Sequence, residues 1–101
     1  MDFKELKELD LYHNEISDIK ILEKLKFEKL EKLNLRFNKI SNIDILENVN
    51  FKELKELDLY NNKISDIKVL EKVKFEKLEK LNLGGIIILN SIFFMEKDNF
   101  E

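Results

Sequence analysis

What the sequence lacks already excludes several classes of protein. None of the 101 residues is a cysteine, which rules out disulfide bonds and metal sites built from thiolates. Proline is absent and glycine occurs only at Gly84 and Gly85, so residues that break helices are nearly missing. No apolar run approaches the roughly 20 residues of a membrane-spanning helix, and the start, MDFKELKELD, has no apolar core of a secretion signal. We therefore expect a soluble, cytoplasmic domain.

The sequence also has no excess of basic over acidic residues. Eighteen Lys and Arg residues face 21 Asp and Glu residues, which gives a net charge of −3. Such a chain carries no electrostatic footprint for nucleic acid or for an anionic membrane surface, and we expect neither as a partner. A chain of this length forms one small domain with a modest core.

The sequence is built on a repeat of 24 residues. FKELKELDLYHNEISDIKILEKLK at 3–26 and FKELKELDLYNNKISDIKVLEKVK at 51–74 differ at only four positions. Between them, FEKLEKLNLRFNKISNIDILENVN at 27–50 keeps the apolar positions and exchanges the charges. A fixed period of this length indicates units that bury their apolar faces against one another. Each unit begins with a phenylalanine, at Phe3, Phe27, Phe51 and Phe75.

Each repeat combines two apolar periodicities. Its pattern, L-x-x-L-x-L-x-x-N-x-I-x-x-I, alternates like a strand at L-x-L and then steps at nearly helical spacing. A strand followed by a helical return, with both apolar faces turned the same way, is one coil of a solenoid. The sequence therefore predicts stacked coils.

These coils resemble the leucine-rich repeat family over residues 3–83. The stretches LKELDLYHNEISDIKIL, LEKLNLRFNKISNIDIL and LKELDLYNNKISDIKVL are similar to its internalin-type subclass, which favours the N-x-I-x-x-I continuation. The resemblance implies an α/β fold: a right-handed solenoid with a parallel concave sheet and short convex helices. It also implies one domain, 1–101, with coils at 3–26, 27–50, 51–74 and 75–85 and an end segment at 86–101. The unit is slightly longer than usual for the subclass, and neither end shows a recognisable cap.

Two features have structural explanations. Asn14, Asn38 and Asn62 recur where the chain turns inward, and a buried amide there satisfies backbone N–H and C=O groups. The charge exchange follows from stacking, because equivalent residues of neighbouring coils lie about 4.8 Å apart and like charges would repel. The predicted columns alternate in sign: Lys4–Glu28–Lys52–Glu76, Glu5–Lys29–Glu53–Lys77, Lys7–Glu31–Lys55–Glu79, Glu8–Lys32–Glu56–Lys80 and, on the return side, Lys20–Asp44–Lys68.

Membership of this family would imply that the concave strand face binds protein ligands. Tyrosine and arginine dominate the binding energy of many interfaces, which directs attention to the column Tyr12–Arg36–Tyr60. We predict a surface for another protein or peptide made of Asp10, Tyr12, His13, Arg36, Phe37, Asp58, Tyr60 and Asn61. In the alternative interpretation, Arg36 stacks between the two tyrosines as a cation–π contact and Phe37 packs over the turn. A module without an external ligand, structural or self-assembling, is the second functional hypothesis.

Catalysis has little support. His13 is the only histidine, and Asn61 replaces it in the third coil. The recurring Ser17, Ser41 and Ser65 are predicted to cap the return helices. No nucleophile triad, metal-binding histidine motif or glycine loop for phosphate is present. We predict a protein that is not an enzyme, with no catalytic residue, metal or cofactor.

The two ends raise a question of assembly. At Gly84 the repeat stops, and Gly-Gly before the apolar run IIIL predicts a hairpin in which residues 86–89 cover the fourth strand. Alternatively the array is decayed or truncated, and the run IIIL…IFF is exposed and prone to β-aggregation. Phe3, Leu6, Leu9 and Leu11 form a first coil with no predecessor. Since repeat arrays need polar caps, we hypothesise either a homo-oligomer through the terminal coils or a longer natural array of which these coils are part.

Overall fold

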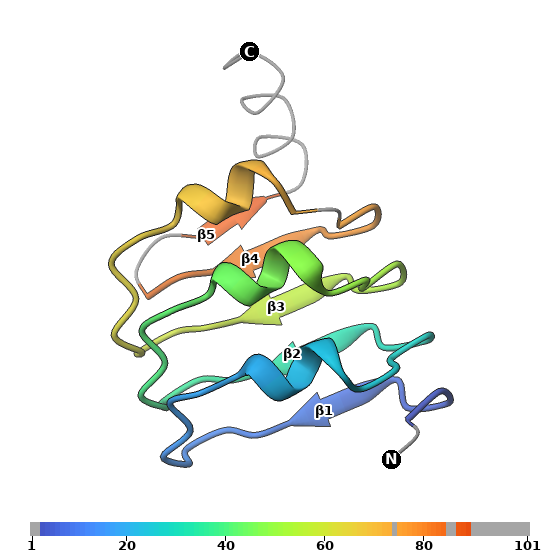
Figure 1. Ribbon diagram of the computed structural model, residues 1–101, viewed down its shortest axis with the longest axis horizontal. Helices are drawn as coiled ribbons and strands as arrows, with labels where there is room; N and C mark the ends of the chain where they lie inside the picture. Colours follow the sequence, from blue (N-terminus) through green and yellow to red (C-terminus); the bar gives the residue numbers. More distant parts are fainter. Residues whose placement is uncertain (1–2, 74, 85–86, 90–101) are drawn as a thin grey trace.

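A computed structural model describes residues 3–73, 75–84 and 87–89. In this part of the chain five short strands form one sheet in sequence order, and three 3-10 helices lie along one side of it (Figure 1). The predicted solenoid with a parallel sheet and short helical returns is confirmed. The strands are β1 (Glu8–Asp10), β2 (Lys32–Asn34), β3 (Glu56–Asp58), β4 (Lys80–Asn82) and β5 (Ile87–Leu89), and the helices are η1 (Lys20–Glu23), η2 (Asp44–Asn48) and η3 (Lys68–Glu71).

The predicted 24-residue register is confirmed at every parallel pair. β1 lies beside β2 with Glu8 opposite Lys32, and β2 lies beside β3 with Leu33 opposite Leu57. β3 and β4 continue the same offset. Five ion pairs join side chains 24 positions apart: Lys29–Glu5 at 2.9 Å, Lys32–Glu8 at 3.7 Å, Lys39–Glu15 at 3.3 Å, Lys55–Glu31 at 3.9 Å and Lys77–Glu53 at 2.9 Å. Four of these pairs lie in the predicted columns, where opposite charges of neighbouring coils meet. Lys39–Glu15 lies in a column that was not predicted and does not alternate, since Lys63 follows Lys39 in it.

These surface pairs set the register more than they add stability. Their side chains are largely exposed, and exposed pairs contribute roughly 0.2–1 kcal/mol each. Lys29 donates a hydrogen bond to Glu5, and this bond together with the negative charge of Glu5 raises the pKa of Lys29 above its ordinary 10.5. A slip by one coil would place like charges together in several columns at once.

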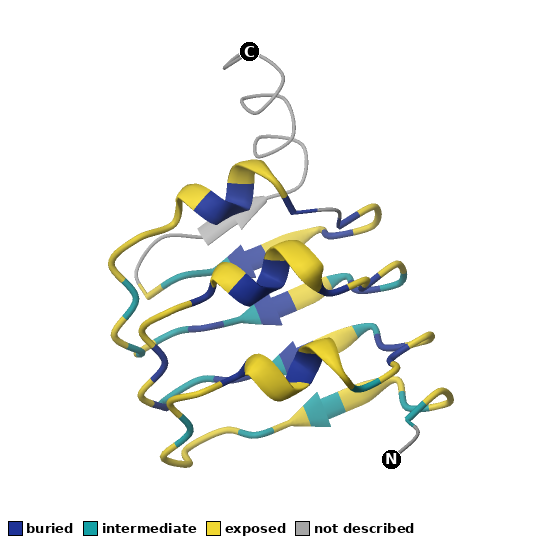
Figure 2. Ribbon diagram, viewed as in Figure 1, coloured by how far each residue is buried: buried dark blue, intermediate teal, exposed yellow. Residues whose placement is uncertain are grey.

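Buried residues recur at equivalent positions of successive coils, on the strands and on the helices, and together form the core (Figure 2). Leu33 and Leu57 point into it and are 1% exposed. The phenylalanines that begin each coil stack in sequence, with ring centroids 5.6 Å apart for Phe3–Phe27, 5.9 Å for Phe27–Phe51 and 6.1 Å for Phe51–Phe75. In the first coil the equivalent side chains are only half-buried, because among the described residues no coil packs on their other side.

The helices are preceded by Asx turns, and the prediction that serines cap them is wrong. The side chains of Asp18, Asn42 and Asp66 accept hydrogen bonds from the backbone N–H two residues later, at 2.8–3.0 Å. Ser17, which precedes Asp18, is exposed, as are its two counterparts. The physical reason is reach: the carboxylate or amide one residue closer to the helix closes the turn first.

The chain reverses after β4, as the Gly-Gly hairpin predicts. β5 pairs antiparallel with β4, with Leu81 opposite Ile88. Gly84 has φ +80°, a left-handed conformation that glycine adopts without steric cost. In coils 1–3 the left-handed residue comes one position later, so the chain turns earlier here and folds back on β4. The rest of the predicted end segment, 86 and 90–101, lies outside the described residues, and so does any exposed run IFF.

Candidate protein-binding surface

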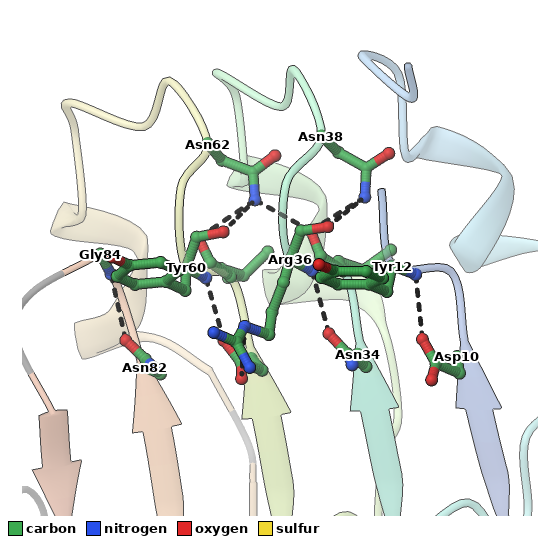
Figure 3. A network of polar contacts seen from close by, with 12 residues as sticks. Asp10, Tyr12, Asn34, Arg36, Asn38, Tyr60, Asn62, Asn82 and Gly84 are labelled. Carbon is green, nitrogen blue, oxygen red and sulfur yellow. Dashed lines mark hydrogen bonds and ion pairs between the residues drawn. The ribbon is translucent and has the colours of Figure 1, made fainter. Parts of the chain in front are cut away.

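A ladder of asparagine side chains fixes the turn that follows each strand (Figure 3). The Asn38 amide is buried, donates to the carbonyls of Leu11, Leu35 and Arg36 at 3.0–3.1 Å, and accepts from the Ile16 N–H at 3.1 Å. Asn62 repeats this arrangement one coil later. Asn38 and Asn62 thus tie their own turns to the preceding coil, as the ladder predicts. The prediction of a buried amide is wrong for Asn14, which is exposed and donates only within its own coil, because no coil precedes it among the described residues.

A second row of side chains shapes the surface itself. The Oδ1 atoms of Asp10, Asn34, Asp58 and Asn82 accept the backbone N–H two residues later, at 3.0–3.2 Å (Figure 3). This local role was missed from the sequence, where Asp10 and Asp58 were assigned only to partner binding. The bonds hold the backbone of Tyr12, Arg36 and Tyr60 just beyond the ends of the strands, and so align these residues across the coils.

The residue after each of these has an unusual backbone. His13, Phe37 and Asn61 adopt the left-handed conformation, with φ of 58°, 56° and 57°. Asparagine tolerates this region well, whereas a bulky side chain such as phenylalanine seldom occupies it. The third coil therefore has a residue suited to the turn, and the second coil has one that is not.

The aromatic rings of three coils form one contiguous cluster, which we call the aromatic row: Tyr12, His13, Phe37 and Tyr60. The Phe37 ring lies between the two tyrosines, with centroids 5.5 Å from Tyr12 and 5.6 Å from Tyr60, both in edge-on geometry. The His13 ring is 6.4 Å from Phe37. Edge-on aromatic pairs contribute about 0.5–1.5 kcal/mol beyond their burial.

Arg36 does not stack between the two tyrosines as the alternative interpretation expects. Its Cζ atom lies 5.1 Å from the Tyr60 ring centroid and 5.8 Å from that of Phe37. The space between the tyrosines is filled by Phe37. The buried Arg36 Nε has no hydrogen bond, and its nearest charge is Asp58 Oδ2 at 3.5 Å. Arg36 is thus held beside the aromatic row by a ring contact and a long ion pair.

A shallow hollow over β1–β3 adjoins the aromatic row on the open face of the sheet, away from the helices. Its polar lining is mostly acidic and consists of Glu8, Asp10, Lys32, Asn34, Glu56 and Asp58. Lys32 forms its ion pair with Glu8 across the hollow. Among the residues described, no three His, Asp or Glu side chains are grouped to hold a metal ion, and no helix is long and apolar enough to cross a membrane.

The structure brings most of the predicted site residues together. Tyr12, His13, Arg36, Phe37 and Tyr60 are in contact, and Asp58 joins them through Arg36. Asp10 holds the Tyr12 backbone. Asn61 is the exception, because it lies at the end of the row near Gly84 and makes no ring contact in the described part of the chain.

A search of curated proteins gives no match. The family model described as Leucine Rich repeats (2 copies) matches residues 4–48 and 52–94, and so covers most of the chain. The chain belongs to the leucine-rich repeat family.

Proposed function

We propose that the protein binds another protein or a peptide through the aromatic row and Arg36. The leucine-rich repeat family generally mediates protein–protein interaction. The observation that carries the proposal is the conformation of Phe37, a bulky, half-buried residue at φ 56°. A left-handed conformation costs a residue with a side chain roughly 1–2 kcal/mol, and strain of this kind clusters at functional sites.

The third coil shows whether this turn requires phenylalanine. At the same position the third coil has Asn61, whose φ of 57° is nearly identical. The turn therefore does not require phenylalanine, and the core does not either, since Phe37 lies outside the buried cluster. A half-exposed ring flanked by two tyrosines is suited to receive an apolar or aromatic side chain of a partner.

The same residues argue against catalysis, and we propose a protein that is not an enzyme. His13 lies beside two aromatic rings, and no acid or nucleophile is known to contact it in the described structure. We also propose membership of the internalin-type subclass, on the recurrence of N-x-I-x-x-I after each of the first three strands.

The test uses a photo-crosslinking phenylalanine analogue in lysate of cells that make the protein. At Tyr12, which is 51% exposed on the aromatic row, we expect adducts with another polypeptide. At Glu47, which is exposed in η2 on the helical side, we expect none. Equal adducts from both positions, or adducts from Glu47 alone, would refute the proposed surface. Mass analysis distinguishes a foreign polypeptide from a second copy of this chain.

A further inference from the structure

The free edge of β1 is the least protected part of the described core. β1 is the terminal strand of the sheet, and its inward-facing Leu9 is only half-buried. Ile21 in η1 is 60% exposed, whereas its counterpart Ile45 in η2 is 9% exposed. Both differences have one cause, since the second coil is covered by a preceding coil and the first is not in the isolated chain.

We propose that this edge accepts the β4 strand of a second copy in parallel register, so that the array continues from one molecule into the next. The charge pattern of the first coil identifies which strand of the second copy pairs with β1. The second, third and fourth coils each follow a coil of opposite charge pattern, and the first coil has the pattern K-E-x-K-E. A preceding coil must therefore have E-K-x-E-K, which the fourth coil supplies at residues 76–80.

The junction between β2 and β3 is an internal template for this contact. There the Lys55 N–H donates to Glu31 O at 2.8 Å, the Leu35 N–H donates to Asp58 O at 2.8 Å, and the Lys55 ammonium lies 3.9 Å from the Glu31 carboxylate. Residues of the second coil correspond to residues 48 positions later in the fourth coil of one copy. Residues of the third coil correspond to residues 48 positions earlier in the first coil of the next copy. Glu79 of one copy takes the place of Glu31, and Lys7 of the next takes the place of Lys55.

A symmetric dimer through two β1 edges is disfavoured by the same charges. Antiparallel pairing about Leu9 would place Glu8 of one copy directly opposite Asp10 of the other, twice per dimer. Like charges in cross-strand pairs are destabilising. The contact is therefore head-to-tail, which leaves a free end on each side and allows open chains of molecules.

In the isolated chain β5 occupies the edge of β4 and competes with the second copy. Ile87, Ile88 and Leu89 carry no charge, so β5 cannot offer the acidic partner that Glu8 would provide for Lys80. Because one strand replaces another, we expect association that is reversible and that grows with protein concentration.

Engineered disulfides test the geometry, and the absence of native cysteine makes the background clean. Glu8→Cys and Lys80→Cys are prepared as separate proteins of residues 1–101, mixed and mildly oxidised. The proposed junction places these positions side by side on neighbouring strands, where Cα atoms about 5 Å apart permit a disulfide. We expect the mixed dimer to exceed either homodimer several-fold, with a yield that rises with concentration.

The control mixture is Lys80→Cys with Glu56→Cys, which lies on the same face but on an interior strand. We expect no cross-link above background. Equal yields in the two mixtures, dominant homodimers of Glu8→Cys, or monomers alone up to about 1 mM protein would each overturn the proposal.

Two peptides then test whether the charge pattern of β4 selects it as the partner of β1. FEKLEKLNL (75–83) should reduce the yield of the mixed dimer, and FKELKELDL (51–59) should not. Equal competition would overturn the assignment of β4 as the occupant. The binding function of the aromatic row is tested by other residues and stands or falls separately.

Discussion

Replacing Asn38 with alanine removes the buried rung of the asparagine ladder, and its effect can be worked out bond by bond. The three carbonyls to which Asn38 donates each keep another donor: Leu11 O from Asn14, Leu35 O from Asn62, and Arg36 O from the His13 N–H. The Ile16 N–H loses the acceptor that Asn38 Oδ1 provides. An N–H group left without a partner costs about 1–3 kcal/mol.

We therefore expect Asn38→Ala to lower the free energy of unfolding by about 2 kcal/mol. For a domain of this size that is a fall in Tm of roughly 8–16 °C. Asn14→Ala is the matched control, since Asn14 is exposed and its side chain donates only to carbonyls of its own coil, Leu11 O and Tyr12 O. The free energy of unfolding of Asn14→Ala should fall by only about 0.5 kcal/mol.

Urea denaturation followed by circular dichroism measures both variants against the unmodified protein. The reasoning is refuted if Asn38→Ala is no more destabilising than Asn14→Ala, because the ladder would then add nothing across coils. We expect the free energy of unfolding to fall further in Asn38→Ala than in Asn14→Ala. The denaturant slope should not change, since the unfolded chain is the same in each case.

Two further predictions concern local bonds. Asp18→Ala removes the acceptor of the Lys20 N–H and should cost about 1 kcal/mol in urea denaturation, whereas Ser17→Ala should be neutral; the reverse order would restore the serine as the cap. Lys29→Gln, which removes the charge without adding a like one, should lower Tm slightly in low salt, an effect that ~1 M NaCl removes because the Debye length falls to about 3 Å. Since Glu5 raises the pKa of Lys29, the contribution of this pair is full below pH 10.5 and is lost as pH rises through the raised pKa; a Tm difference that persists in high salt or at higher pH would contradict the pairing.

The stacking of the coils could be predicted from the sequence, because it depends on periodic features. Phenylalanine every 24 residues, leucines at strand spacing and charges of alternating sign all specify one register, and that register is observed. The reversal at Gly84 was predictable for a similar reason, since Gly-Gly before an apolar run favours a hairpin.

The details of the surface could not be predicted, because they depend on local geometry that the repeat does not encode. Asp10 and Asp58 were assigned to partner binding, yet each uses one oxygen to hold the backbone two residues later. The left-handed conformation of Phe37 opposes its intrinsic preference, so no propensity argument predicts it. That conformation belongs to the turn, and with it the Phe37 ring rather than Arg36 lies between the tyrosines.

Phe37→Asn is the measurement that tests the proposed surface most directly, because the third coil already shows that asparagine fits this turn. The variant loses edge-on ring contacts and gains relief from the left-handed strain, so the free energy of unfolding should change by no more than about 1 kcal/mol. Measured on the same preparation, cross-linking from position 12 to a foreign polypeptide should disappear. A fall in stability of more than about 2 kcal/mol with cross-linking retained would contradict the account and make Phe37 a packing residue.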